Sequence, residues 1–202
     1  ATIFVESKAN IKNDILIDGI SYTIDGSKAS IAKSTCPTED KQLKIPTTIT
    51  YEGSTYSVES ISEGAFYGCS HFIGDLSIPD SIKFIGYNAF SKCGFSGSLN
   101  INANIDIDSS LFSGSDKWSG NLIIGDSVQS IGSRSFEELF THGKTLTIGT
   151  SVTSIGTLAF YNCQFSEQKT VIIPSNVQNL GGCFLSLVTG PKIFKSTPTS
   201  QF

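Results

Sequence analysis

A phenylalanine that recurs at a nearly constant interval is the feature that most constrains how this chain can fold. Successive members of the column are separated by 24, 22, 24, 24 and 24 positions, and they are Phe66, Phe90, Phe112, Phe136, Phe160 and Phe184. Six occurrences at nearly equal intervals of this length are typical of proteins that stack one supersecondary unit many times. The sequence therefore predicts a repeat architecture.

Each interval carries the same pattern of residues around its phenylalanine. A Leu-x-Ile triplet is followed by Pro or Gly, then by Ile-Gly, and then by Ala-Phe-x-x-Cys, most clearly from Leu76 to Cys93 and from Leu146 to Cys163. The triplet predicts a short strand whose Leu and Ile point the same way, because side chains alternate along a strand. The Ala-Phe-x-x-Cys stretch suits a short helical turn with its three named side chains facing inward.

One such unit cannot bury its apolar face alone, whereas stacked units share a continuous core with parallel strands about 4.8 Å apart. We therefore expect a β-rich α/β repeat solenoid, a right-handed superhelix of about six repeats of 22–25 residues. Cap strands are expected over residues 1–42, repeats over 43–184, and an irregular cap or tail over 185–202, together forming one folded unit.

The full repeat pattern, Gly-x-Leu-x-Ile-Pro-x-Ser-Val-x-x-Ile-Gly-x-x-Ala-Phe-x-x-Cys, resembles the BspA-type leucine-rich repeat. It runs from Gly74 to Cys93 and begins again at Gly120 and at Leu146. The unit over 99–115 departs from the pattern, because it lacks Ile-Gly and carries Ser115 in the Cys column. The resemblance implies a secreted or cell-surface protein that binds host extracellular-matrix proteins such as fibronectin or fibrinogen.

Charge and motif content exclude several other functions. The net charge is −4 with a single arginine, so we expect no nucleic-acid partner, because nothing offsets the phosphate charge. No apolar run approaches the roughly 18 residues of a membrane span. The sequence offers no nucleophile–base pair, and the carboxylates at 137–138 and 106–108 make only a weak case for catalysis. We expect a monomeric, non-enzymatic protein without a cofactor.

The positions free to vary between repeats are the candidate binding residues, because solenoids bind through extended surfaces. Those in the middle of the Leu-x-Ile strands are Ser77, Asn100, Ile123, Thr147 and Ile172. Those preceding the Ile-Gly pair are Lys83, Gln129, Thr153 and Gln178. The two isoleucines in a polar field would form a modest apolar patch. The alternative, that these columns are merely solvated, stays open.

Side-chain oxygens recur at alternate positions from the middle of the Leu99-Asn100-Ile101 triplet onward, at Asn100, Asn102, Asn104, Asp106 and Asp108. The last four could hold a hard cation such as Ca²⁺, which prefers oxygen ligands. We favour a solvated face opposite the buried isoleucines. A carbohydrate- or cation-dependent binding module and a structural spacer that displays another domain are the alternative functions.

Cysteines and a second aromatic column complete the pattern. Cys69, Cys93 and Cys163 share one column, where we expect buried small apolar side chains. Cys36 lies outside the repeats, and we expect either an exposed free thiol or an incidental surface residue there. Four residues before successive strands stand Phe72, Phe95, Trp118 and His142, which predicts a packing column with a possible binding role for the tryptophan.

Overall fold

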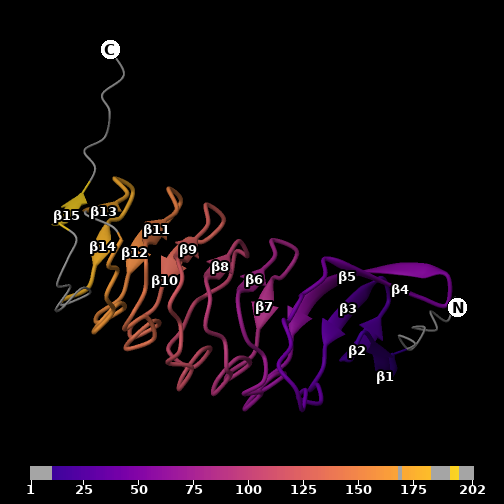
Figure 1. Cartoon of the computed structure of the whole chain (residues 1–202). Helices are drawn as coiled ribbons and strands as arrows, with labels where there is room; N and C mark the ends of the chain where they lie inside the picture. Colours follow the sequence, from indigo (N-terminus) through magenta and orange to yellow (C-terminus); the bar gives the residue numbers. More distant parts are fainter. Residues whose placement is uncertain (1–10, 168–169, 183–191, 196–202) are drawn as a thin grey trace, which may run out of the picture.

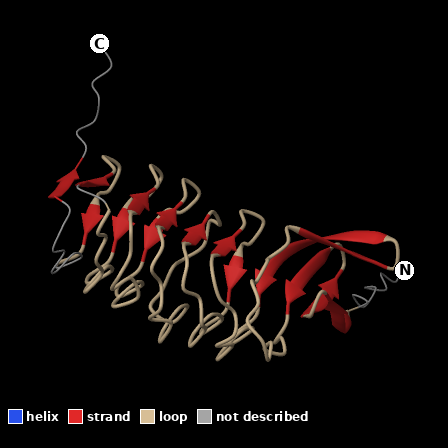
Figure 2. Cartoon of the chain, viewed as in Figure 1, coloured by secondary structure: helices blue, strands red, loops and turns tan. Residues whose placement is uncertain are grey.

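The chain forms an elongated stack of β-strands and turns, shown along its length in Figure 1. The computed structural model describes residues 11–167, 170–182 and 192–195. Figure 2 shows strands joined by turns, and the described residues contain no helix. The predicted β-rich repeat solenoid is confirmed. Most of the predicted tail, together with Phe184, lies outside the described residues.

A sheet of mixed direction closes the N-terminal end of the stack. Its path runs β1-β2-β3-β5-β4, with β7 paired to the far end of β5. The strands are β1 (Lys12–Ile17), β2 (Ile20–Asp25), β3 (Lys28–Ile31), β4 (Thr48–Tyr51), β5 (Ser54–Ile61) and β7 (Phe84–Ile85). The first hairpin turns at Asp18 and Gly19, both at positive φ, which matches the right-handed twist of the strands that it joins. The predicted boundary at residue 42 stays a prediction.

The Leu-x-Ile triplets form the first repeat sheet, which is entirely parallel and has the order β11-β9-β8-β6. Its strands are β6 (Leu76–Ile78), β8 (Leu99–Ile101), β9 (Leu122–Ile124) and β11 (Leu146–Ile148). Leu pairs with Leu and Ile with Ile in every step, and both are buried as predicted. The next triplet strand, β13 (Thr170–Ile173), pairs with β15 (Lys192–Lys195) instead.

A second parallel sheet forms where the repeats carry Ile-Gly. It has the order β10-β12-β14, with β10 (Ser130–Ile131), β12 (Ser154–Ile155) and β14 (Asn179–Leu180). The two repeat sheets lie on different sides of the stack (Figure 1). The unit over 99–115 contributes only an isolated bridge from Ile107 to Ile131, so this sheet is interrupted at the third repeat.

The Ala-Phe-x-x-Cys segments fold as tight turns rather than as the expected helical turns. Two residues of each full repeat, four positions apart, have positive φ, which interrupts a right-handed helix. The pairs are Asn88 and Lys92, Arg134 and Glu138, and Leu158 and Asn162, with Gly64 and Gly68 at the same places in the first repeat. The Ala, Phe and Cys side chains face inward, as predicted.

Two ladders of stacked aromatic rings run through the core. The rings of the phenylalanine column from Phe66 to Phe160 stack with centroids 5.4, 5.7, 6.2 and 5.4 Å apart. The second ladder is Phe72, Phe95, Trp118, Phe140 and Phe165. The prediction for His142 is therefore wrong: Phe140 occupies its place in the column, and His142 is exposed. Trp118 is 1% exposed, which excludes a direct binding role.

The two free cysteines of the cysteine column donate hydrogen bonds. The Cys93 thiol donates to the carbonyl of Phe66, and the Cys163 thiol donates to that of Phe136. Ser115, which departs from the pattern, makes the equivalent bond to the carbonyl of Phe90, at 2.9 Å. The serine therefore keeps the polar contact, and the column is more than the purely apolar packing that we expected.

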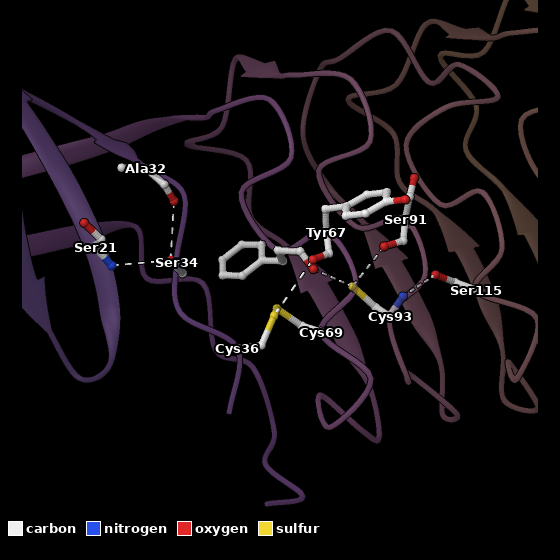
Figure 3. Close-up of a disulfide and its surroundings, with 10 residues drawn as sticks. Ser21, Ala32, Ser34, Cys36, Tyr67, Cys69, Ser91, Cys93 and Ser115 are labelled. Atoms are coloured by element: carbon white, nitrogen blue, oxygen red, sulfur yellow. Dashed lines mark hydrogen bonds between the residues drawn. A yellow bond between two sulfur atoms is a disulfide. The ribbon is translucent and has the colours of Figure 1, made fainter. Parts of the chain in front are cut away.

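The expectation of a free Cys36 is wrong, because Cys36 forms a disulfide with Cys69 (Figure 3). The two Cα atoms lie 4.9 Å apart, and the bond closes a separation of 33 residues. It ties the segment after β3 to the turn of the first repeat. Sequence spacing gave no sign of this pair, since Cys36 stands outside the repeat and only the fold brings the two together.

Candidate functional site

The first repeat sheet carries a column of outward-facing residues at the middle of its strands. Ser77 pairs with Asn100, Asn100 with Ile123, and Ile123 with Thr147, so the four side chains stand in register on one face. Ser77 and Thr147 are exposed, and the two residues between them are half-buried. Parallel pairing is what aligns them, since each strand repeats the register of its neighbour.

The column continues across a groove to Ile172, whose side chain is 58% exposed. This groove has a volume of about 380 Å³ and lies between β11 and β13. Thr147 and Ile172 line it together with Ile148, Pro174 and Asn176. The face therefore ends in a groove whose lining mixes apolar side chains, such as Ile172 and Pro174, with polar ones, such as Thr147 and Asn176.

Asn100 contributes an unusual acceptor to this face. Its side-chain Oδ1 is buried and has no hydrogen-bond partner in the described chain. A buried acceptor without a partner costs free energy. The apolar side chains that the face presents are Ile123, which is half-buried, and Ile172, which is exposed.

The second predicted set directly precedes the strands of the Ile-Gly segments, so the nine candidates do not form one column: Gln129, Thr153 and Gln178 stand before β10, β12 and β14 of the second repeat sheet, and Lys83 stands before β7 of the cap sheet. Thr153 N–H donates to the carbonyl of Gln129, and Gln178 N–H donates to that of Thr153. Lys83 stands at the same place in the second repeat, where its ammonium lies 3.0 Å from Glu59. Lys28 reaches the same carboxylate, and hydrogen bonds from the two lysines lower the pKa of Glu59.

The polar side chains that follow β8, the strand of the third repeat, alternate with buried side chains, as predicted. Ala103, Ile105 and Ile107 are buried, and Asn102, Asn104, Asp106 and Asp108 between and beside them are half-buried or exposed. Only residues 99–101 of this stretch form a strand. In the described part of the chain, no three Asp, Glu, His or Cys side chains gather closely enough to hold a metal ion.

Two exposed aromatic residues escaped the sequence analysis. Phe84 is 61% exposed and Tyr87 is 63% exposed, and both line a cleft of about 240 Å³ beside β7. The repeat pattern does contain the signal. The other repeats place Ser130, Ser154 and Asn179 where this one has Phe84, and Ser133, Thr157 and Gly182 where it has Tyr87.

Another hollow lies between the cap sheet and the first repeat. It has a volume of about 510 Å³. Tyr22, Leu43, Ile49 and Phe72 line it, and so does Lys41. Burial raises the pKa of Tyr22 to about 12, so this phenol stays neutral. No cluster of reactive groups accompanies it.

Taken together, these features define a class: a parallel β-solenoid whose units bury Leu, Ile and stacked aromatics and present small variable residues outward. The match to the BspA type Leucine rich repeat region, in six copies over residues 44–167 and 106–193, agrees with that class. The chain belongs to this family. No curated protein matches the chain.

Solved structures show the same fold. A leucine rich cell surface protein from Faecalibacterium prausnitzii A2-165 is 18% identical, with a TM-score of 0.59 over 95% of this chain and 56% of that one. A leucine-rich repeat protein from Bacteroides ovatus is 26% identical, with a TM-score of 0.55, 92% of this chain covered and 41% of that one. The pneumococcal vaccine antigen PcpA is 20% identical, with a TM-score of 0.61 and coverages of 93% and 50%. The chain thus spans about half the length of these proteins.

The described residues also include no helix with the length and apolar character needed to cross a membrane.

Proposed function

We propose that this chain is a protein-binding module of a secreted or cell-surface protein, and that its partners are host extracellular-matrix proteins of the fibronectin or fibrinogen class. The observation that carries the proposal is the in-register column on the first repeat sheet, which ends in the groove between Thr147 and Ile172. Many weak polar and apolar contacts along such a rigid face add up to affinity without covalent chemistry.

Two further observations support this location and role. The Cys36–Cys69 disulfide is a bond that persists in oxidising environments outside the cytosol. One of the similar structures is a cell surface protein and another is a vaccine antigen, which fits a chain that meets host molecules. The fibronectin or fibrinogen class itself rests on the family resemblance alone.

The test is surface binding of the purified, disulfide-intact chain to immobilised fibronectin, fibrinogen, laminin and collagen, with and without a chelator. The informative variant is the double substitution Ile123→Ser and Ile172→Ser, which removes the apolar part of the face. Leu16→Ser is the matched control, because Leu16 is 71% exposed but lies on the cap strand β1.

We expect saturable binding that resists the chelator, weakens about tenfold in the double variant, and is unchanged in the control. Loss of binding with the chelator would instead favour a cation-dependent module that uses the Asn and Asp side chains. Absence of binding to all four proteins would overturn the proposal in favour of a spacer that displays another domain.

A further inference from the structure

A gap separates β7, at the edge of the cap sheet, from the second repeat sheet. On one side β7 pairs with β5, but among the described residues no β-bridge and no backbone hydrogen bond joins it to residues 105–108. That segment stays attached to the following repeat, since Gly132 N–H donates to the carbonyl of Ile107. The third repeat is the short one that lacks Ile-Gly, so it cannot supply the missing strand.

The gap opens the 240 Å³ cleft, whose two walls differ in chemistry. Phe84 and Tyr87 stand on the β7 side, where their rings are mostly exposed. Asp106 and Asp108 stand on the opposite side, beside the buried Ile105. A cleft lined by two exposed rings and two carboxylates is a surface that an apolar partner alone would satisfy poorly.

The negative charge of the cleft is not balanced from within the chain. Neither Asp106 nor Asp108 forms an ion pair with any described residue, although Asp108 accepts hydrogen bonds from Ser110. Lys83, at the rim, already pairs with Glu59 at 3.0 Å. The carboxylates are therefore available to a cation from outside.

The exposed rings also differ from others on this protein. The ammonium of Lys12 lies 4.9 Å from the ring centre of Tyr51, and that of Lys92 lies 5.3 Å from the ring centre of Tyr67. No such cation covers Phe84 or Tyr87 within the described part of the chain. A positive group over an aromatic face is stabilised by the ring quadrupole, so these two rings offer the same interaction to a partner.

We propose that this cleft binds an arginine side chain presented by an extended segment of a partner protein. A guanidinium is planar, stacks on aromatic faces, and carries five N–H donors that match carboxylate oxygens. A second copy of this chain is a poor source, because its single arginine, Arg134, already lies 2.8 Å from the carboxylate of Glu137. The site is independent of the first repeat sheet.

The experiment titrates the isotope-labelled full chain with two peptides and follows backbone amide chemical shifts by NMR. The probe is an acetylated, amidated Thr-Val-Arg-Val-Thr peptide, and its control has citrulline in place of arginine, which keeps the shape and removes the charge. We expect shifts confined to residues 83–87 and 105–108, and a much weaker response to the citrulline peptide.

Two variants test the two walls separately. Asp106→Asn removes charge, and Phe84→Ser removes a ring; both side chains are exposed, so the fold is expected to persist. Loss of the cation–π contact should weaken binding about 2–5-fold, and loss of the carboxylate should weaken it at least as much. Asp116→Asn, an exposed carboxylate that does not line this cleft, is the matched control and should bind as the parent does.

Three results would overturn the proposal. They are an equal response to both peptides, shifts that map outside the cleft, and unchanged binding in Asp106→Asn and Phe84→Ser when their spectra show an intact fold. Shifts that appear with rising protein concentration and no peptide would show that a second copy fills the cleft instead.

Discussion

Removing the Cys36–Cys69 disulfide should destabilise the protein by about 4 kcal/mol, because the bond closes a loop of 33 residues whose freedom in the unfolded chain would be restored. The change to make is Cys36→Ala. Cys36 is half-buried, whereas Cys69 is fully buried, so an alanine at 36 removes the bond with little loss of packing.

The assay is equilibrium urea unfolding followed by far-ultraviolet circular dichroism, on parent and variant, with and without dithiothreitol. Reductant should lower the stability of the parent by about the same amount as the substitution and should leave the variant unchanged. Hydrogen exchange should show the loss concentrated in β2 and β3, because each unit of a solenoid contacts mainly its neighbours.

Cys163→Ser is the matched control, because it alters a free thiol and keeps a hydroxyl that can donate to the carbonyl of Phe136. An unfolding midpoint of the parent protein that is the same with and without dithiothreitol would refute the reasoning. Alkylation of the unfolded chain gives a second test. The disulfide predicts that two fewer cysteines are alkylated before reduction than after it, and equal numbers would also refute the reasoning.

Three further predictions concern the repeats. Phe112→Ala, in the middle of the first aromatic ladder, should cost about 3–5 kcal/mol in urea unfolding, and a loss below 1 kcal/mol would contradict a continuous stack. Leu158→Asn should stabilise by about 1 kcal/mol, because Leu158 has φ +59°, which asparagine tolerates better; a lower melting temperature would count against this strain. Burial raises the pKa of Cys163 to about 12 from an ordinary value of 9.0, so the unfolded chain loses its thiol proton first and stability should fall as pH rises from 9 toward 12. Melting curves at pH 7 and pH 10 should show a smaller loss for Cys163→Ser than for the parent, and equal losses would contradict it.

The sequence predicts the repeat part of the fold because every unit carries apolar residues at the same positions and has to bury them in the same way. Leu and Ile at alternate positions must share a face, and a column such as Phe90 and Phe112 recurs at an interval that only stacking can bury. It also predicts which strand positions face outward, including Ser77 and Thr147. Its error over the Ala-Phe-x-x-Cys segment has a local cause, since apolar spacing does not reveal that two residues per turn are left-handed.

The candidate sites depended far more on the tertiary structure. The nine predicted residues separate into two groups, one in the Leu-x-Ile strands and one directly before the strands of the Ile-Gly segments, because the turn between these segments redirects the chain and spacing alone does not give that angle. Phe84 and Tyr87 meet Asp106 only because one repeat is short and leaves its sheet open.

The sequence by itself therefore determined the period, the inward residues and the outward columns, since these follow from the alternation of side chains and from the need to bury them. Only the tertiary structure decided which residues meet across repeats. It joined Cys36 to Cys69, placed Phe140 rather than His142 against Trp118, and opened the cleft beside β7. These features bring together segments that are far apart in the sequence, and their geometry is set by how whole units pack rather than by any local preference.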